Sequence, residues 1–562
     1  MTTEGAYLKD YCEKTAEEFL KTVFVVDDEA TFNAAREETT TSDTSEAPDN
    51  KEDEVIEVSL KGGEEADANS TTPVVTPDRK VIPVSETDSE VPTERTNNIL
   101  DVKVLTEAFL EKGIFCSAYK PPDSEKPYEN CEIALKNADV LILDWDINND
   151  SQGTHTKNII NEIVKDNNET PKRRALIVVY SALNPNDIEE KLKEILHLGE
   201  TIEYIEKNGI RIVVVQKKSD EDKLPAKVIE EFGKMHSGIL ERAALMVMTG
   251  IRENTFEFIS RFNQEMDAPF LAHRTILPTP EDAEAHILEL LVSDLSSLIF
   301  QLKSNNELMT KKMIKDWFLY RLSNGLSIET KPNSSLTPEE ISDHLTMIVY
   351  SGITDVNSNT DFPKLVIAKN KSASSKKKKN IEACEILVSA IAGSSVPADV
   401  RLLNSKLSNL FSIQNSYINK LPALSFGTIL QDRSEGYWLC LMPLCDSVRI
   451  VGERGFPFLE LNSAVEEKFD ISLLKNDEPV YLKVNYTVYE QKYFWFTPRE
   501  NALQIFAIKE DEEFVFRARN RKIFNWRGIL KREFAQKIAN EYSSHVSRVG
   551  VNESEWQRLN AG

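Results

Sequence analysis

The chain contains little that would indicate a secreted, metal-stapled or membrane-spanning protein. It has six cysteines in 562 residues, and no two of them form a CxxC pair. A zinc site or a disulfide framework is therefore not expected, and scattered free thiols fit a reducing cytoplasm. We see no apolar run near the ~18 to 20 residues of a membrane helix. The N-terminus also lacks a basic segment followed by an apolar one, so no secretory signal is expected.

Positive charge is scarce as well. The sequence has 67 basic and 92 acidic residues, a formal net charge of −25. A chain of this charge repels nucleic acid as a whole, so DNA is not an expected partner. Hydrophobic residues make up 41% and charged residues 28%, which is typical of soluble globular proteins. The length predicts about three or four domains.

The second half of the chain lacks familiar catalytic motifs. None of the seven histidines has the HExxH spacing, and neither a GxxxxGK[ST] loop nor a GxSxG elbow occurs. Cys445 and Asp446 follow an apolar run, which we interpret as a buried thiol beside a turn aspartate. A helical stretch near 335–348 vaguely suggests a helix-turn-helix. It carries acids rather than arginines, so DNA binding by this helix is not expected. Residues 221–562 therefore form no recognisable catalytic set, and the activity of this region stays open.

Residues 15–220 alternate short apolar runs with segments of helical periodicity. The apolar runs are KTVFVVDDEATF, IFCSAY, ADVLILD, ALIVVYSA and GIRIVVVQKKS, ending near residues 32, 119, 144, 182 and 219. This alternation predicts an α/β domain with a doubly wound, five-stranded parallel sheet of the flavodoxin-like kind. A different composition interrupts it: Asn33–Arg95 is rich in Thr, Ser and Pro, with 17 acidic and 6 basic residues. We expect residues 33–96 to be a disordered acidic insertion.

The remaining chain divides by composition into three parts. Residues 221–368 read as mainly helical, beginning with the apolar stripe of Val228, Phe232, Met235 and Ile239. Residues 369–380 form a basic linker rich in Ser and Lys. Residues 381–562 read as helical and then β-rich, closed by a C-terminal helix. The first domain would then comprise residues 1–220.

Polar residues follow four of the five predicted strands. They are Asp27 and Asp28, then Asp144 and Asp146, then Ser181, and finally Lys217 and Lys218. In a parallel sheet these strand ends share one edge, where ligands bind. Clustered carboxylates favour a cation such as Mg²⁺, whereas a lysine and a hydroxyl suit phosphoryl oxygens. A carboxylate can also accept a phosphoryl group covalently. Ser181 or Asp146 alone is equally well explained as a helix cap, but capping does not explain polar residues at four strand ends at once.

Together the motifs VVDDE, LILDWD, VVYSA and VVVQKK resemble the receiver domain of two-component response regulators, over residues 15–220. The resemblance implies that Asp144 accepts a phosphoryl group from a histidine kinase or phosphotransfer protein. It implies further roles at the strand ends: Asp27 and Asp28 for Mg²⁺, Asp146 for a backbone carbonyl completing that site, Ser181 for the switch hydroxyl, and Lys217 for pairing with the phosphoryl group. Lys218 is nearly as good a candidate as Lys217.

The sequence departs from that family in two places and leaves alternatives open. The fifth strand lacks the family's aromatic switch residue, and no proline follows the lysine. A pseudo-receiver scaffold that only assembles partners is one alternative. A haloacid-dehalogenase-type, Mg²⁺-dependent phosphatase is another, because its first motif is also DxD; however, its nucleophile strand comes first, whereas here Asp27 and Asp28 precede Asp144.

The resulting hypothesis is a cytoplasmic signalling protein of uncertain enzymatic activity. Its phosphorylated receiver would control an effector function through residues 221–562. Receivers fused to large, unfamiliar output regions are similar to regulators of bacterial conflict and phage-defence gene clusters, a comparison at the level of domain arrangement only. The kinase, the signal and the oligomeric state stay open.

Overall fold

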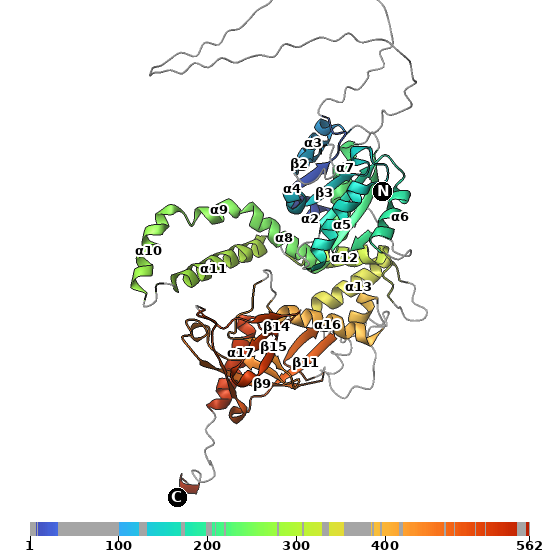
Figure 1. Ribbon diagram of the computed structural model, residues 1–562. Helices are drawn as coiled ribbons and strands as arrows, with labels where there is room; N and C mark the ends of the chain where they lie inside the picture. Colours follow the sequence, from blue (N-terminus) through green and yellow to red (C-terminus); the bar gives the residue numbers. More distant parts are fainter. Residues whose placement is uncertain are drawn as a thin grey trace, which may run out of the picture. The chain divides into compact units, whose positions relative to one another are not determined.

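The computed structural model describes most of the chain outside a few segments. The described residues are 7, 9–31, 100–122, 132–169, 175–197, 205–207, 209–217, 221–277, 280, 282–305, 308–328, 336–352, 384, 387–393, 396–414, 420–465, 468–476, 478–500, 502–511, 513–547 and 558–560. The predicted insertion 33–96 and linker 369–380 lie outside them. Two compact units are present: Cys12–Leu302, and Met1–Tyr11 together with Lys303–Gly562 (Figure 1).

The first unit is built on a mixed sheet whose strands follow the predicted apolar runs. Its strands are β1 (Thr22–Val26), β2 (Phe115–Tyr119), β3 (Val140–Asp144), β4 (Ala175–Ser181), β5 (Ile205–Lys207) and β6 (Ile210–Gln216), in the order β2-β1-β3-β4-β6-β5. Without β5 this is the flavodoxin-like order, as predicted. The added strand β5 pairs antiparallel with β6. The two strands form an edge hairpin, and Gly209, at φ 81°, lies directly before β6.

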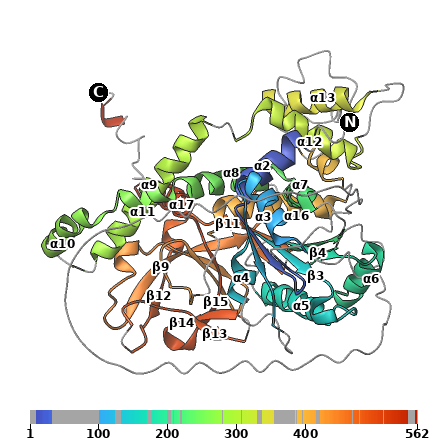
Figure 2. The same cartoon turned by 90° about the horizontal axis from the view of Figure 1, so that it is seen from above.

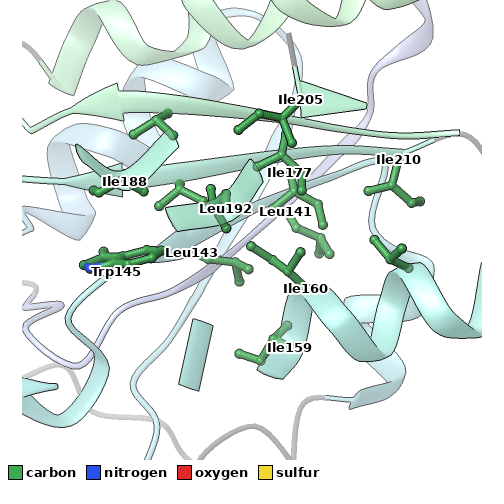
Figure 3. Close-up of a cluster of buried hydrophobic side chains, with 14 of the residues drawn as sticks. Leu141, Leu143, Trp145, Ile159, Ile160, Ile177, Ile188, Leu192, Ile205 and Ile210 are labelled. Carbon is green, nitrogen blue, oxygen red and sulfur yellow. The ribbon is translucent and has the colours of Figure 1, made fainter. Parts of the chain in front are cut away.

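Helices cover both faces of this sheet. They are α2 (Lys14–Phe19), α3 (Val102–Glu111), α4 (Glu132–Asn137), α5 (Thr154–Glu169), α6 (Pro185–Ile195) and α7 (Leu224–Met235). On one face, Leu141 and Leu143 of β3 pack with residues of α5 and α6 such as Ile160 and Leu192 (Figure 3). On the other face, β3 packs with α3 and α7. Strand β3 is therefore buried along its whole length, which explains its uninterrupted apolar sequence.

Four more helices of this unit extend beyond α7, and we call them the arm. They are α8 (Ile239–Glu253), α9 (Thr255–Ser260), α10 (Asp267–Ile276) and α11 (Asp282–Asn305). In Figures 1 and 2, α8 and α9 run outward and α11 runs back beside them. By length and composition, Asp282–Leu302 of α11 is apolar enough to cross a membrane, with a hydropathy of 1.4. The expectation of no such run is thus wrong on this criterion, since four acids and three serines interrupt the apolar residues of this segment. One helix of this kind is weak support for a span.

The second unit combines helices with a large antiparallel sheet. Its described helices include α12 (Lys311–Ser323), α13 (Pro338–Ser351), α16 (Pro397–Ser412) and α17 (Arg532–Val546). Its described strands are β7 (Thr428–Asp432), β8 (Tyr437–Cys440), β9 (Arg454–Ser463), β10 (Ile471–Lys475), β11 (Glu478–Val484), β12 (Lys492–Phe496), β13 (Ile508–Glu510), β14 (Glu513–Arg517) and β15 (Ile523–Ile529). Phenylalanines such as Phe456, Phe458 and Phe524 fill one core of the module. The predicted β-rich C-terminal module is confirmed, and α17 follows its last strand.

Candidate functional site

The four strand ends singled out in the sequence meet at one edge of the first sheet. Asp27 follows β1, Asp144 ends β3, Ser181 ends β4 and Lys217 follows β6. Because β1, β3, β4 and β6 are neighbouring parallel strands, their carboxyl ends lie side by side. Asp27, Asp144 and Ser181 are all at most 5% exposed. Buried polar side chains require partners, so the site must be built around ionic and hydrogen-bonded contacts.

Lys217 is the cation at the centre of this edge. Its Nζ lies 2.8 Å from Asp27 Oδ2 and 3.1 Å from Asp144 Oδ2. Its backbone N–H donates to the Ser181 carbonyl over 2.7 Å, which extends the pairing of β4 with β6 by one residue. Its ammonium also lies 5.8 Å from the ring centroid of Tyr180, a cation–π distance. Lys217 therefore occupies the predicted position; Lys218 lies outside the described residues.

Three carboxylates converge beside this ammonium. Oxygens of Asp27, Asp28 and Asp144 all lie within 4.8 Å of one another. Asp28 Oδ2 accepts from the backbone N–H of Asn148 at 2.9 Å. The other oxygen of Asp28, Oδ1, and Oδ1 of Asp146 are buried and have no hydrogen-bond partner among the described residues. Orphaned buried carboxylate oxygens in an acid cluster fit a hard divalent cation, so Asp27, Asp28 and Asp144 are the residues present that could hold Mg²⁺.

The charges of the cluster also favour a bound cation. Burial raises the pKa of Asp144 to about 7; Lys217 opposes this shift, and Asp27 adds to it. Burial also raises the pKa of Asp146. For Lys217, burial disfavours the charged form, but Asp144 and Asp27 outweigh it and raise the pKa. One ammonium thus leaves the acids incompletely neutralised, and an additional cation would favour their ionised forms.

The turn after β3 holds Asp144 in place through residues to which the sequence analysis assigned no role. The hydroxyl of Thr156 donates to the Asp144 carbonyl. The Trp145 ring is fully buried at the end of the core cluster in Figure 3, and its Nε1 donates to the Ser151 carbonyl at 3.3 Å. Gly153 lies so close that an added Cβ would be 2.3 Å from that ring. The sequence feature that could have indicated this contact is Gly153, which follows the Asp144-Trp145 pair at the end of β3 by eight residues.

One interpretation of the second unit needs correction. Cys445 is exposed, not buried as predicted. It lies in a single 3-10 turn, Leu444–Asp446, beyond the end of β8, so the sheet does not cover it. The buried thiol of this segment is Cys440, the last residue of β8, and burial raises its pKa to about 12. An alternating strand and the turn after it cannot be told apart by hydrophobicity alone.

A comparison with known families identifies the domain that contains this site. Residues 19–225 match the family model described as a response receiver domain. Comparisons with curated proteins and with solved structures found no match. The matched range runs from the end of α2 into α7 and contains all of the described strands of the first sheet and every predicted site residue. Residues 19–225 of this chain are therefore a response receiver domain.

Proposed function

We propose that the chain is a response regulator of a phosphorelay, in which Asp144 accepts a phosphoryl group and the modified receiver controls the C-terminal region. The donor would be a histidine kinase or a phosphotransfer protein. The observation that carries this proposal is the contact of one buried lysine with both Asp27 and Asp144. This arrangement, inside a receiver domain, provides an acceptor, a metal-binding acid and a cation for the transferred group.

In the proposed reaction, a phosphoryl group moves from a phosphohistidine of the donor to Asp144. A carboxylate oxygen of Asp144 attacks phosphorus while the P–N bond of the donor phosphohistidine breaks. The electron pair of that bond returns to the imidazole, which then takes a proton. Lys217 Nζ, already 3.1 Å from Asp144, pairs with a phosphoryl oxygen as charge develops there. Mg²⁺, bound by Asp27, Asp28 and Asp144, would offset the negative charge of both reactants.

Ser181 connects this chemistry to the surrounding fold. In the described state its Oγ accepts from the backbone N–H of Leu183 at 3.2 Å. A phosphoryl oxygen on Asp144 would be a charged acceptor for the Ser181 hydroxyl, and charged acceptors form stronger hydrogen bonds. Reorientation of this hydroxyl would remove its bond to Leu183 and alter the loop that enters α6. The switch would thus act through β4 and α6 without the aromatic residue usual on the last strand.

Mass spectrometry can test the proposal directly. The full chain is incubated with Mg²⁺ and a small phosphodonor such as acetyl phosphate, and we expect one acid-stable, base-labile phosphoryl group. Asp144→Asn should abolish it, whereas Asp150→Asn, in the same loop, should retain it. Absence of label on the wild-type chain would favour the pseudo-receiver scaffold. Label surviving Asp144→Asn would refute the acceptor assignment, and steady turnover of phosphomonoesters would favour the phosphatase.

A further inference from the structure

The arm exposes an unusual amount of apolar side-chain surface. Helices α9 and α10 contain no buried residue, and in α11 Ala283 alone is buried among the side chains described. Large apolar side chains that are 56% to 86% exposed occur along its length, and they include Phe256, Ile259, Ile276, Leu288, Leu290, Val292 and Phe300. Single exposed apolar residues are ordinary, but so many on neighbouring helices favour an interaction surface.

The base of the arm is firmly joined to the receiver domain. Arg242 of α8 is buried, and its Nε donates to the Thr15 hydroxyl of α2 at 2.7 Å. Arg252 near the end of α8 pairs with Asp139 at 2.8 Å, and its guanidinium lies 4.4 Å from the Phe19 ring centroid. The arm therefore begins from fixed contacts.

The two legs of the arm also contact each other. Leu302 of α11 lies against Gly250 of α8, where an added Cβ would be 2.3 Å from the leucine. Farther out, Arg261 pairs with Asp294 of α11 at 3.0 Å. These contacts make a helical hairpin, in agreement with the two views in Figures 1 and 2. A hairpin covers one side of each helix and leaves the other sides free.

The exposed residues of α11 are not confined to one side of the helix. Leu288 and Leu290 are two positions apart, which places them about 200° apart around the axis at 3.6 residues per turn. Val292 lies again on the side of Leu288. Because α8 and α9 cover one side only, a further helix pair is needed to cover the rest. A second hairpin related by a two-fold axis completes a four-helix bundle, which is a closed, self-complementary arrangement.

Charge and area favour a second copy as that partner. Between His286 and Leu302 the sequence has two charged residues, Glu289 and Asp294, and Asp294 is already paired. A chain of net charge −25 can therefore approach its copy here with little repulsion. The seven side chains named above supply about 100 Å² each, about 700 Å² together, which approaches the ~800 Å² per partner of a standard interface. Asp294 and three serines near the middle of α11 disfavour a lipid environment.

We propose that the described helices of the arm, α8 to α11, form a homodimerisation surface that pairs two chains through α11. The dimer does not depend on phosphorylation of Asp144, because the arm's apolar surface is exposed without it. It would hold two receiver domains at the ends of one helical bundle, since each arm is anchored to its receiver through Arg242 and Arg252.

Sedimentation velocity of the full chain over a concentration series tests this inference. We expect a species of twice the chain mass that dissociates on dilution. The double variant Leu288→Glu and Val292→Glu should be monomeric at concentrations at least tenfold above the wild-type midpoint. Val451→Glu, which changes a 90% exposed residue of the second unit, should dimerise like the wild type. A wild type that is monomeric throughout, or a double variant that still dimerises, would overturn the proposal.

Two further measurements keep the test independent of misfolding. Hydrogen exchange of wild-type α11 amides should slow with rising concentration, while β3 amides should not change. Concentration-independent exchange in α11 would contradict the dimer. Co-sedimentation with phospholipid vesicles, expected to be absent, examines the lipid alternative. Binding of the wild type, lost in the double variant, would show that a bilayer and not a second chain covers the arm.

Discussion

Lys217 and Asp144 make a 3.1 Å ion pair although their strands, β6 and β3, are not neighbours. Strand β4 lies between them, and Lys217 reaches across its end beside Ser181. The ammonium contacts Asp27 as well, so a single side chain joins the ends of three strands. The stability of the domain, its cation binding and its chemistry should therefore all respond to this lysine.

Replacing this lysine should destabilise the metal-free receiver domain. Lys217→Met leaves Asp27 and Asp144 buried without their shared cation, and loss of one partner of a buried pair costs about 3–5 kcal/mol. Urea unfolding in EDTA, followed by hydrogen exchange in β3, measures the change. Lys227→Met removes a partly exposed ion pair of α7 and should cost less than about 1 kcal/mol. Equal losses for the two variants would contradict the central role of Lys217.

The raised pKa of Asp144 predicts a pH dependence of stability in the absence of metal. Burial raises this pKa from 3.8 to about 7, so the folded state holds the proton more tightly than the unfolded state. The stabilisation is complete below the unfolded pKa and is lost as pH rises through about 7. The receiver's unfolding midpoint in EDTA should therefore fall between pH 4 and pH 8. Asp144→Asn should show a smaller fall. If the unfolding midpoints of the wild type and of Asp144→Asn changed equally with pH, the pH dependence could not be attributed to Asp144.

Asp28 should be a determinant of cation affinity. Its Oδ1 is buried without a described partner, whereas Oδ2 is held by the Asn148 amide. Asp28→Asn keeps the side-chain shape but removes a charge, so we expect Mg²⁺ affinity to fall about tenfold or more. Titration calorimetry measures it. Glu29→Gln, next in the chain but outside the three-acid cluster, is the matched control and should change affinity little. A larger loss of Mg²⁺ affinity in Glu29→Gln than in Asp28→Asn would exclude Asp28 as a ligand.

The packing of Trp145 on Gly153 predicts a strong effect of one methyl group. Gly153→Ala places a Cβ into the indole ring and also occupies φ 67°. Gly113 has a similar φ of 71° but open space around it. Gly113→Ala should cost roughly 1–2 kcal/mol from backbone strain alone. Gly153→Ala should cost about 1–3 kcal/mol more, because overpacking adds to the strain. Chemical denaturation compares the two, and equal costs would mean that the ring moves aside freely.

Much of the site could be predicted because its residues follow buried strands directly. An apolar run such as VLILD identifies a covered strand, and the topology of a doubly wound sheet brings the ends of such strands together. The supporting turn could not be predicted in the same way. Contacts such as those of Trp145 with Gly153 and of Thr156 with the Asp144 carbonyl depend on how the loop closes, and no periodic pattern encodes that closure.

By itself, the sequence determined the α/β domain and the strand-end residues Asp27, Asp28, Asp144, Ser181 and Lys217, because burial and strand periodicity are local properties. Only the tertiary structure decided which groups touch: Lys217 on Asp27 and Asp144, Cys445 outside the sheet, and α11 with large apolar side chains such as Leu288 and Val292 left exposed. Which side of a strand or helix is covered depends on partners that are distant in the chain, and a local pattern does not contain them.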